Sequence, residues 1–254
     1  MKYKTAVILC GGRGTRLGSL GKKIPKSLVE IHKNPIIWYI IKILHKNSFN
    51  HFILPIGYKG NLIKKYFKKN KSFKYFNIEI VETGQDTPIA ERIYKIKQRI
   101  KSKNFLLLNG DAIFDFDLKK IFDKHLKLKF DITFIGCAAK LNFGIVAKEN
   151  NKIVNFIRGV EFNSIKKNEK SNFIGYVYSG ISIINSKLLK INFKKFSNFE
   201  KKFYPKIIKK YKPNFEEING FWHSIDNYKD INDLNEKKNK IKYNFIKKMS
   251  KKIK

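Results

Sequence analysis

The sequence predicts an α/β protein with a doubly wound, Rossmann-like and mainly parallel sheet, to which a smaller β lobe is added in the second half of the chain. Three observations support this prediction. Up to about residue 130, short apolar runs that end in Gly, Pro or Asn alternate with longer segments of helical period. A glycine-rich loop follows the first apolar run, and beyond residue 130 strand patterns dominate. The 254 residues are enough for one domain of this kind with a substantial core.

The first half of the chain supplies the predicted parallel sheet. Its strands are expected at residues 5–9, 51–55, 78–81 and 105–108, and its helices at residues 34–46, 61–68 and 89–100. Asp115 and Asp117 are expected to cap a further helix after the last of these strands. Right-handed crossovers bring the carboxyl ends of successive strands to one edge of the sheet. Ligands of open α/β sheets bind at that edge, so functional residues are expected in the loops that follow the strands.

The second half is expected to be richer in strands, at residues 131–137, 143–147, 153–157 and 176–184, with a polar loop at 164–172. One domain is predicted over residues 1–235, and its two halves meet near residue 130. Beyond it, apolar residues recur at near-helical intervals on a lysine-rich background. A basic amphipathic helix is therefore predicted over residues 236–254, which packs on the domain, forms a homodimer contact or touches anionic lipid.

The chain is strongly basic. It has 55 Lys and Arg residues against 20 Asp and Glu, a formal charge of +35, which attracts polyanions. Nucleic acid, nucleotide polyphosphates and a compositional bias toward Lys, Ile, Asn and Phe are the competing explanations. The lysines are spread along the whole chain and no DNA- or RNA-binding motif is present, so no nucleic-acid partner is predicted. The charge alone supports an anionic small ligand only weakly.

The sequence also indicates the cellular compartment of the protein. No apolar stretch reaches the roughly 18 residues that a membrane-spanning helix needs, which argues against stable membrane insertion. The apolar run near the N-terminus ends in a glycine loop rather than a cleavage site, so it is interpreted as a strand and the protein as cytoplasmic. Cys10 and Cys137 end apolar runs and are expected to be buried, reduced thiols. The five histidines show no metal-ligand spacing, so no structural metal is assigned.

The strongest functional signal is the stretch LCGGRGTRLGSLGKKIPKSLVEI at residues 9–31. It places three glycines directly after a buried strand, where they let the backbone approach a triphosphate and point successive N–H groups at its oxygens. Arg16 and Lys26 can then neutralise the charge that develops on a departing pyrophosphate. The stretch is not a Walker loop, because GK[ST] is absent, and no acidic ribose partner marks it as a dinucleotide-binding loop.

Six stretches make the sequence resemble the sugar-1-phosphate nucleotidyltransferases, and within that family the glucose-1-phosphate cytidylyltransferase type. They are GGRGTRL at 11–17, PKSLVEI at 25–31, GYKGNLIKKYF at 57–67, ETG at 82–84 with Arg92 beyond it, NGD at 109–111 and GFWHSID at 220–226. Together they span nearly the whole chain. The resemblance implies a nucleotide-diphospho-sugar transferase fold. Residues up to about 130 would then bind a nucleoside triphosphate, and residues 131–235 would bind the acceptor.

The resemblance also implies an activity. Enzymes of this family transfer a nucleotidyl group from a nucleoside triphosphate, here CTP by preference, to a small phosphorylated acceptor and release pyrophosphate. Mg²⁺ is the implied cofactor. No protein nucleophile is needed, because the acceptor phosphate is already ionised and positioning and charge neutralisation dominate. A non-catalytic relative is expected to lack one of Arg16, Lys26, Asp111 and Asp226, and all four are present.

The resemblance assigns roles to individual residues. The implied metal ligands are Asp111, which follows the apolar run FLLLN directly after Gly110, and Asp226, which ends GFWHSID. The implied catalytic cations are Arg16 and Lys26. The implied nucleotide-binding residues are Leu9, Gly11, Gly12, Gly14, Thr15, Arg16, Thr83, Gly84, Arg92 and Gly110.

Two departures from the family pattern concern the acceptor. Where the family carries Glu-Lys-Pro and Asn-Gly-Gly, this chain has Arg158, Gly159, Val160 and Tyr178, Ser179, Gly180. The residues expected at the acceptor are Arg158, Ser179 and Gly180. Arg158 can bind a phosphate in bidentate fashion, but contacts for sugar hydroxyls are not evident. The chain is also similar to capsular cytidylyltransferases that act on phosphorylated glutamine, so L-glutamine phosphate is the expected acceptor, with a glucose or heptose 1-phosphate as the alternative.

Overall fold

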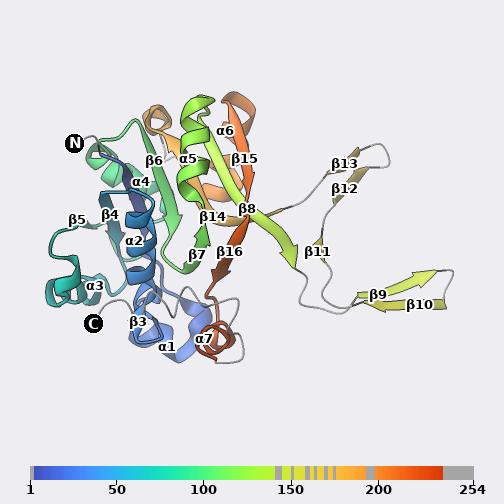
Figure 1. The fold of residues 1–254 in the computed structure, drawn as a ribbon, viewed down its shortest axis with the longest axis horizontal. Helices are drawn as coiled ribbons and strands as arrows, with labels where there is room; N and C mark the ends of the chain where they lie inside the picture. Colours follow the sequence, from blue (N-terminus) through green and yellow to red (C-terminus); the bar gives the residue numbers. More distant parts are fainter. Residues whose placement is uncertain are drawn as a thin grey trace.

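The computed structural model describes residues 3–140, 145–149, 152–157, 161–162, 165–168, 171–173, 176–192 and 198–236. A mixed sheet of eight strands runs through the molecule and is flanked by helices (Figure 1). The strand order is β11-β8-β14-β6-β1-β4-β5, and β15 pairs with β8. The α/β class and the Rossmann-like arrangement that the sequence predicts are confirmed.

The main sheet has a parallel half and a mixed half. Its strands are β1 (Thr5–Leu9), β4 (His51–Ile56), β5 (Asn77–Glu82), β6 (Asn104–Asn109), β8 (Ile132–Lys140), β11 (Glu161–Phe162), β14 (Tyr176–Asn185) and β15 (Pro213–Glu217). The neighbours β6, β1, β4 and β5 are parallel, as expected for successive right-handed crossovers. Strand β14 lies antiparallel between β6 and β8 and so joins the second half of the chain to the first.

The α-helices are α1 (Gly18–Lys23), α2 (Ile36–Lys46), α3 (Gly60–Lys69), α4 (Ile89–Ile96), α5 (Leu118–Lys127), α6 (Tyr204–Lys210) and α7 (Tyr228–Asn235). Helices α2 to α5 lie where the sequence predicts them, with small shifts at their ends, whereas α1, α6 and α7 were not predicted. Helix α2 begins two residues later than expected because β3 (Asn34–Pro35) pairs with β2 (Glu30–Ile31). Helix α4 ends at Ile96, and a 3-10 turn continues it.

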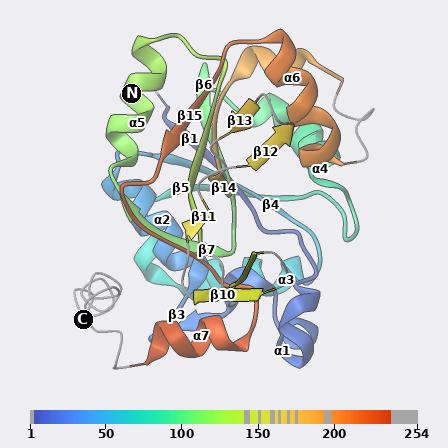
Figure 2. The same cartoon turned by 90° about the vertical axis from the view of Figure 1, so that its right-hand side faces the viewer.

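The two faces of the sheet carry separate apolar cores. Side chains alternate along a strand, so Ala6 and Ile8 of β1 pack with α2 and α5, whereas Val7 packs with α4 and α6. Figure 2 shows these two helix pairs on opposite sides of the sheet. Because both faces are covered, β1, β4 and β6 are nearly continuous apolar runs, which is the pattern that made them predictable, whereas the edge strand β5 is only half-buried.

An antiparallel ribbon beside the sheet corrects one prediction. Strand β7 (Ala112–Phe116) pairs with β16 (Gly220–Ser224) and sets Asp115 opposite Phe221. Asp115 therefore belongs to a strand and does not cap the following helix. Asp117 does cap it, because its Oδ1 accepts a hydrogen bond of 2.9 Å from the Lys120 N–H in the first turn of α5.

The second half carries short hairpins. Strands β9 (Ile145–Glu149) and β10 (Lys152–Ile157) form one, and β12 (Ile165–Asn168) and β13 (Ser171–Phe173) form another. For the described part of the loop predicted over 164–172, namely residues 165–168 and 171–172, the prediction is wrong, because these residues belong to paired strands despite their mostly polar side chains. In Figure 1 both hairpins lie outside the body formed by the sheet and its helices.

Two other expectations meet the structure only in part. Neither Cys10 nor Cys137 forms a disulfide, but only Cys10 is buried; Cys137 is half-buried and lies beside the exposed Val177 of β14. Of the predicted C-terminal helix over 236–254, only Glu236 is among the described residues. Across the residues that the structure describes, no helix combines the length and the apolar character needed to cross a bilayer.

A buried histidine ties α5 to the sheet and makes stability depend on pH. His125 contacts Thr133 Oγ1 at 2.8 Å and Asn104 Oδ1 at 3.0 Å, and burial lowers its pKa to about 4. The unfolded chain, with a pKa near 6.5, takes up a proton first as the pH falls. The contribution of neutral His125 is thus complete above about pH 6.5 and is lost progressively toward pH 4, by at most about 3 kcal/mol.

We predict that His125→Gln flattens the fall in the free energy of unfolding between pH 6.5 and 4.5, measured by urea titration at each pH. The substitution removes the titrating group, so the slope with pH is the informative quantity rather than the absolute stability. His45, which is exposed, provides the matched control, and His45→Gln is expected to keep the parent slope. An unchanged slope in His125→Gln contradicts the prediction.

Candidate active site

A cavity of about 480 Å³ opens at the carboxyl ends of β1 and β6. Its lining comes from four parts of the chain that are far apart in sequence: residues 9–17 with Lys26 and Ser27, residues 85–89 with Arg92, residues 109–111, and Asp226. This is the edge of the sheet at which open α/β folds bind ligands. The structure thus brings most of the predicted site residues to one place.

The glycine loop forms one wall of the cavity. Gly14 adopts a left-handed conformation with φ of 62°, and its carbonyl accepts a hydrogen bond of 3.0 Å from the Leu17 N–H. This turn starts the short 3-10 helix Thr15–Leu17 and directs Arg16 toward the cavity. Backbone N–H groups at such a turn have few partners within the helix, so they are suited to an anionic ligand.

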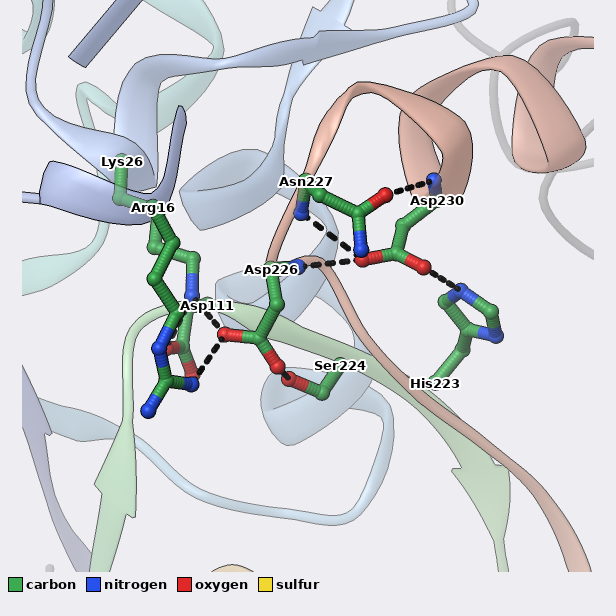
Figure 3. A network of polar contacts seen from close by, with 8 residues as sticks. All are labelled: Arg16, Lys26, Asp111, His223, Ser224, Asp226, Asn227 and Asp230. Atoms are coloured by element: carbon green, nitrogen blue, oxygen red, sulfur yellow. Dashed lines mark hydrogen bonds and ion pairs between the residues drawn. The ribbon is translucent and has the colours of Figure 1, made fainter. Parts of the chain in front are cut away.

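An ion-pair cluster occupies the centre of the cavity wall. Lys26 Nζ lies 2.8 Å from Asp111 Oδ2 and 2.8 Å from Asp226 Oδ1 (Figure 3). Because one nitrogen contacts both, the two carboxylate oxygens lie within 5.6 Å of each other. Arg16 Nη1 also contacts Asp226 Oδ1, at 3.2 Å, from a largely exposed position. Two acidic residues from the middle and the end of the domain therefore converge on one site.

Backbone and side-chain contacts hold Asp226 in this position. Ser224 Oγ donates to Asp226 Oδ2 at 2.7 Å, which leaves Oδ1 turned toward Lys26. Asp230, in the first turn of α7, accepts hydrogen bonds from the N–H groups of Asp226 and Asn227 at 2.6 and 2.9 Å (Figure 3). The Asp230 N–H in turn donates to Asn227 Oδ1 at 3.1 Å, and with the Asn227 N–H contact this completes a capping box that fixes the start of α7 directly after the site.

Burial and ion pairing oppose each other in this cluster. Burial lowers the pKa of Lys26, but the Asp111 and Asp226 carboxylates outweigh it and leave that pKa above its ordinary value. Burial raises the pKa of Asp226, but hydrogen bonds from Lys26 and Ser224 bring that pKa below its ordinary value. Burial raises the pKa of the nearby Cys10 thiol to about 12, so Cys10 is protonated and is not a nucleophile at neutral pH.

Comparison with known proteins agrees with this site. The model of the nucleotidyl transferase family matches residues 5–241. The chain belongs to this family. A probable glucose-1-phosphate cytidylyltransferase from Bacillus subtilis is 30% identical over 250 residues, which cover 91% of this chain and 94% of that protein. A D-glycero-alpha-D-manno-heptose 1-phosphate guanylyltransferase from Aneurinibacillus thermoaerophilus is 31% identical over 155 residues, 59% of this chain and 66% of that protein.

A solved structure supports the fold. HddC from Yersinia pseudotuberculosis, complexed with GMP-PN, superposes with a TM-score of 0.67 over 90% of this chain and 96% of that chain, at 22% identity. The family model and the curated relatives confirm the family resemblance that the six sequence stretches carry, and the protein is a nucleotidyltransferase.

Arg92 of the nucleotidyltransferase is buried and bonded to the protein. Its Nη1 and Nη2 donate to the carbonyl oxygens of Ile56, Gly11 and Gln85 at 3.1, 3.0 and 3.2 Å, and Nη1 also donates to Thr83 Oγ1. Thr83 and Gly84 stand behind the cavity rather than in its lining. Arg92 thus joins the glycine loop to the β5–α4 wall, a structural connection that sequence reasoning did not indicate.

The structure does not bring the predicted acceptor residues into the cavity lining. Ser179 is buried and its hydroxyl donates to the Ile135 carbonyl at 2.6 Å, while Gly180 packs against the Asn109 side chain. Neither residue lines the cavity, and Arg158 lies outside the described residues. Sequence reasoning gave no role to Arg13 and Asp86, which also line the cavity. Arg13 lies within the GGRGTRL stretch but differs from Arg16 in having no assigned role, and Asp86 belongs to none of the six stretches.

The packing around Arg92 generates a matched test. A Cβ at Gly11 would overlap the buried Arg92 guanidinium, whereas a Cβ at Gly12 would meet no atom within 4 Å. Neither glycine has a positive φ, so packing alone separates them. We predict that Gly11→Ala lowers the free energy of unfolding by about 1–3 kcal/mol, as overpacking does, and that Gly12→Ala changes it by less than about 0.5 kcal/mol. Denaturant titration measures both, and equal effects are incompatible with this account.

Proposed function

We propose that this nucleotidyltransferase transfers CMP from CTP to the phosphate of a sugar 1-phosphate and releases pyrophosphate. The observation that carries the proposal is the convergence of Asp111, Asp226, Lys26 and Arg16 beside the glycine loop in one cavity. CTP is supported by the resemblance to the cytidylyltransferase type and by the Bacillus subtilis relative. We place the reaction in the cytoplasm, where nucleoside triphosphates are available.

The chain's own groups suit an in-line displacement at the α-phosphorus. The N–H groups of the glycine loop and the charge of Arg16 hold the β- and γ-phosphates. Lys26 lies deeper, between the two carboxylates, and neutralises charge at the reacting phosphate. The acceptor phosphate attacks as an anion, so no general base or protein nucleophile is required. Catalysis then depends on holding two anions against each other in the correct orientation.

A divalent metal ion fits the donors that are present. Enzymes of this family generally use one, and Asp111 with Asp226 supplies the hard oxygen ligands that Mg²⁺ prefers. Within the described residues no group of three or more His, Cys, Asp or Glu side chains gathers at metal-binding distance. Mg²⁺ commonly takes one or two carboxylates and completes its shell with phosphate and water, so two carboxylates suffice. When bound, Mg²⁺ would stabilise negative charge on the α-phosphate.

A second acceptor is favoured by a specific observation. Where the family carries Asn-Gly-Gly, this chain has Tyr178, Ser179 and Gly180. The hydroxyl of Tyr178 already contacts those of Ser182 and Tyr204, and the buried hydroxyl of Ser179 donates to the Ile135 carbonyl. No sugar-hydroxyl contact is therefore evident at this position. L-Glutamine phosphate, a non-sugar phosphate, is the second candidate acceptor, and it would place the enzyme in capsule synthesis. The sugar 1-phosphate remains first because the curated relatives are named for sugar 1-phosphates.

The donor and acceptor are tested together by pyrophosphate release. We expect turnover with CTP and Mg²⁺ to exceed that with GTP, UTP or dTTP, and glucose 1-phosphate or a heptose 1-phosphate to serve as acceptor. Turnover of L-glutamine phosphate without turnover of either sugar phosphate would replace the first acceptor by the second. Absence of pyrophosphate release with every pair of substrates would count against the nucleotidyl transfer itself.

Single substitutions test the roles of the ion-pair cluster. Asp111→Ala and Lys26→Ala are each expected to reduce kcat by about 100-fold or more, because each removes a charge that acts on the reacting phosphates. Both variants should stay folded by circular dichroism, since neither side chain belongs to the apolar core. Asp117→Ala is the control: it removes the cap of α5, away from the cavity, and should cost about 1 kcal/mol of stability while kcat is retained. Near-parental kcat in either cluster variant would refute its role.

A further inference from the structure

A second ion pair spans the cavity beside the cluster already described. Arg13, in the middle of the glycine loop, donates from Nε to Asp86 Oδ1 at 2.6 Å and from Nη2 to Asp86 Oδ2 at 2.8 Å. Both residues line the cavity, and Asp86 belongs to the opposite β5–α4 wall. The Arg13 guanidinium also lies over the Tyr58 ring, 5.1 Å from its centroid. The pair therefore connects two walls of the nucleotide cavity.

Arg13 has the same kind of partner as Arg16 and Lys26, the two cations that we assign to the phosphates of the nucleotide. Arg16 and Lys26 each contact a carboxylate of the same cavity, and so does Arg13. A nucleoside triphosphate carries several negative charges and competes for such cations. Asp86 takes donors from only two of the three Arg13 nitrogens, and a guanidinium has five donors in all. Arginine also binds phosphate in bidentate fashion, as it binds a carboxylate here.

The Arg13–Asp86 pair is weak enough to open. The Arg13 and Asp86 side chains are 50% and 63% exposed, so water and salt screen their attraction. Exposed pairs of this kind contribute roughly 0.2–1 kcal/mol. By contrast, Lys26 is only 16% exposed and is held by two carboxylates. A ligand that offers Arg13 a more highly charged partner therefore has to replace an ion pair of only small free energy.

We propose that Arg13 is an additional triphosphate-binding residue. Asp86 holds Arg13 when the cavity contains no nucleotide and therefore competes with the substrate for it. The proposal rests on the proposed function for the presence of a nucleoside triphosphate in this cavity. When nucleotide binds, Arg13 exchanges the Asp86 carboxylate for an oxygen of the β- or γ-phosphate, and no covalent bond is made or broken. Asp86 thereby lowers the affinity for nucleotide.

Binding of CTP and of CMP, measured by isothermal titration without acceptor, tests the proposal. Arg13→Gln is expected to weaken CTP binding by about three- to tenfold, as loss of a charged phosphate contact does. Asp86→Asn is expected to tighten it by about two- to fivefold, in line with the small energy of an exposed pair. Neither substitution should change CMP affinity, because CMP lacks the β- and γ-phosphates. The double variant should bind CTP as weakly as Arg13→Gln does.

A matched ion pair outside the cavity lining controls for net charge. Lys64 and Glu82 contact each other at 2.5 Å and are 49% and 71% exposed, close to the exposures of Arg13 and Asp86. Lys64→Gln and Glu82→Gln repeat the two charge changes and should leave CTP affinity unchanged. The inference is overturned if Asp86→Asn binds CTP equally or less tightly, or if Arg13→Gln weakens CMP as much as CTP. Failure of the parent protein to bind any nucleotide would instead overturn the proposed function and this inference together.

Discussion

The active site depends on one ammonium group held between two carboxylates. Lys26 contacts Asp111 and Asp226, which lie 85 and 200 positions further along the chain, at 2.8 Å each. Two carboxylates this close repel each other. By standing between them, Lys26 offsets this repulsion and holds both carboxylates at the cavity. The site is therefore prepared before any ligand arrives.

Backbone contacts make this convergence obligatory. The Ile225 N–H donates to the Asp111 carbonyl at 2.9 Å, so the residue before Asp226 is tied to Asp111 itself. The β7–β16 ribbon continues this pairing away from the site. On the other side, buried Arg92 bonds the glycine loop to the β5–α4 wall. The cavity thus has walls fixed by buried contacts, while the charged groups that face a ligand remain partly exposed and able to change partners.

Much of this could be predicted from the sequence, for identifiable reasons. The strands at 5–9 and 105–108 are buried on both faces and so appear as uninterrupted apolar runs, and the glycine loop follows one of them directly. The β7–β16 ribbon could not be predicted in this way, because its pairing joins segments about a hundred residues apart and leaves no local pattern. Asp115 was misassigned for that reason. Arg92 resembles any helical arginine until its partners are known.

The balance of charge in the cavity differs from that of the whole chain. The lining contains Arg13, Arg16, Lys26 and Arg92 against Asp86, Asp111 and Asp226, whereas the chain as a whole carries +35. The large excess of lysine therefore lies elsewhere, where it raises the rate at which anions of every kind arrive and is screened within about 10 Å. Inside the cavity a nucleotide meets cations that already have partners. Its affinity is then a difference between two sets of ion pairs, and the geometry of the exchange, rather than the net charge, decides which anion stays bound.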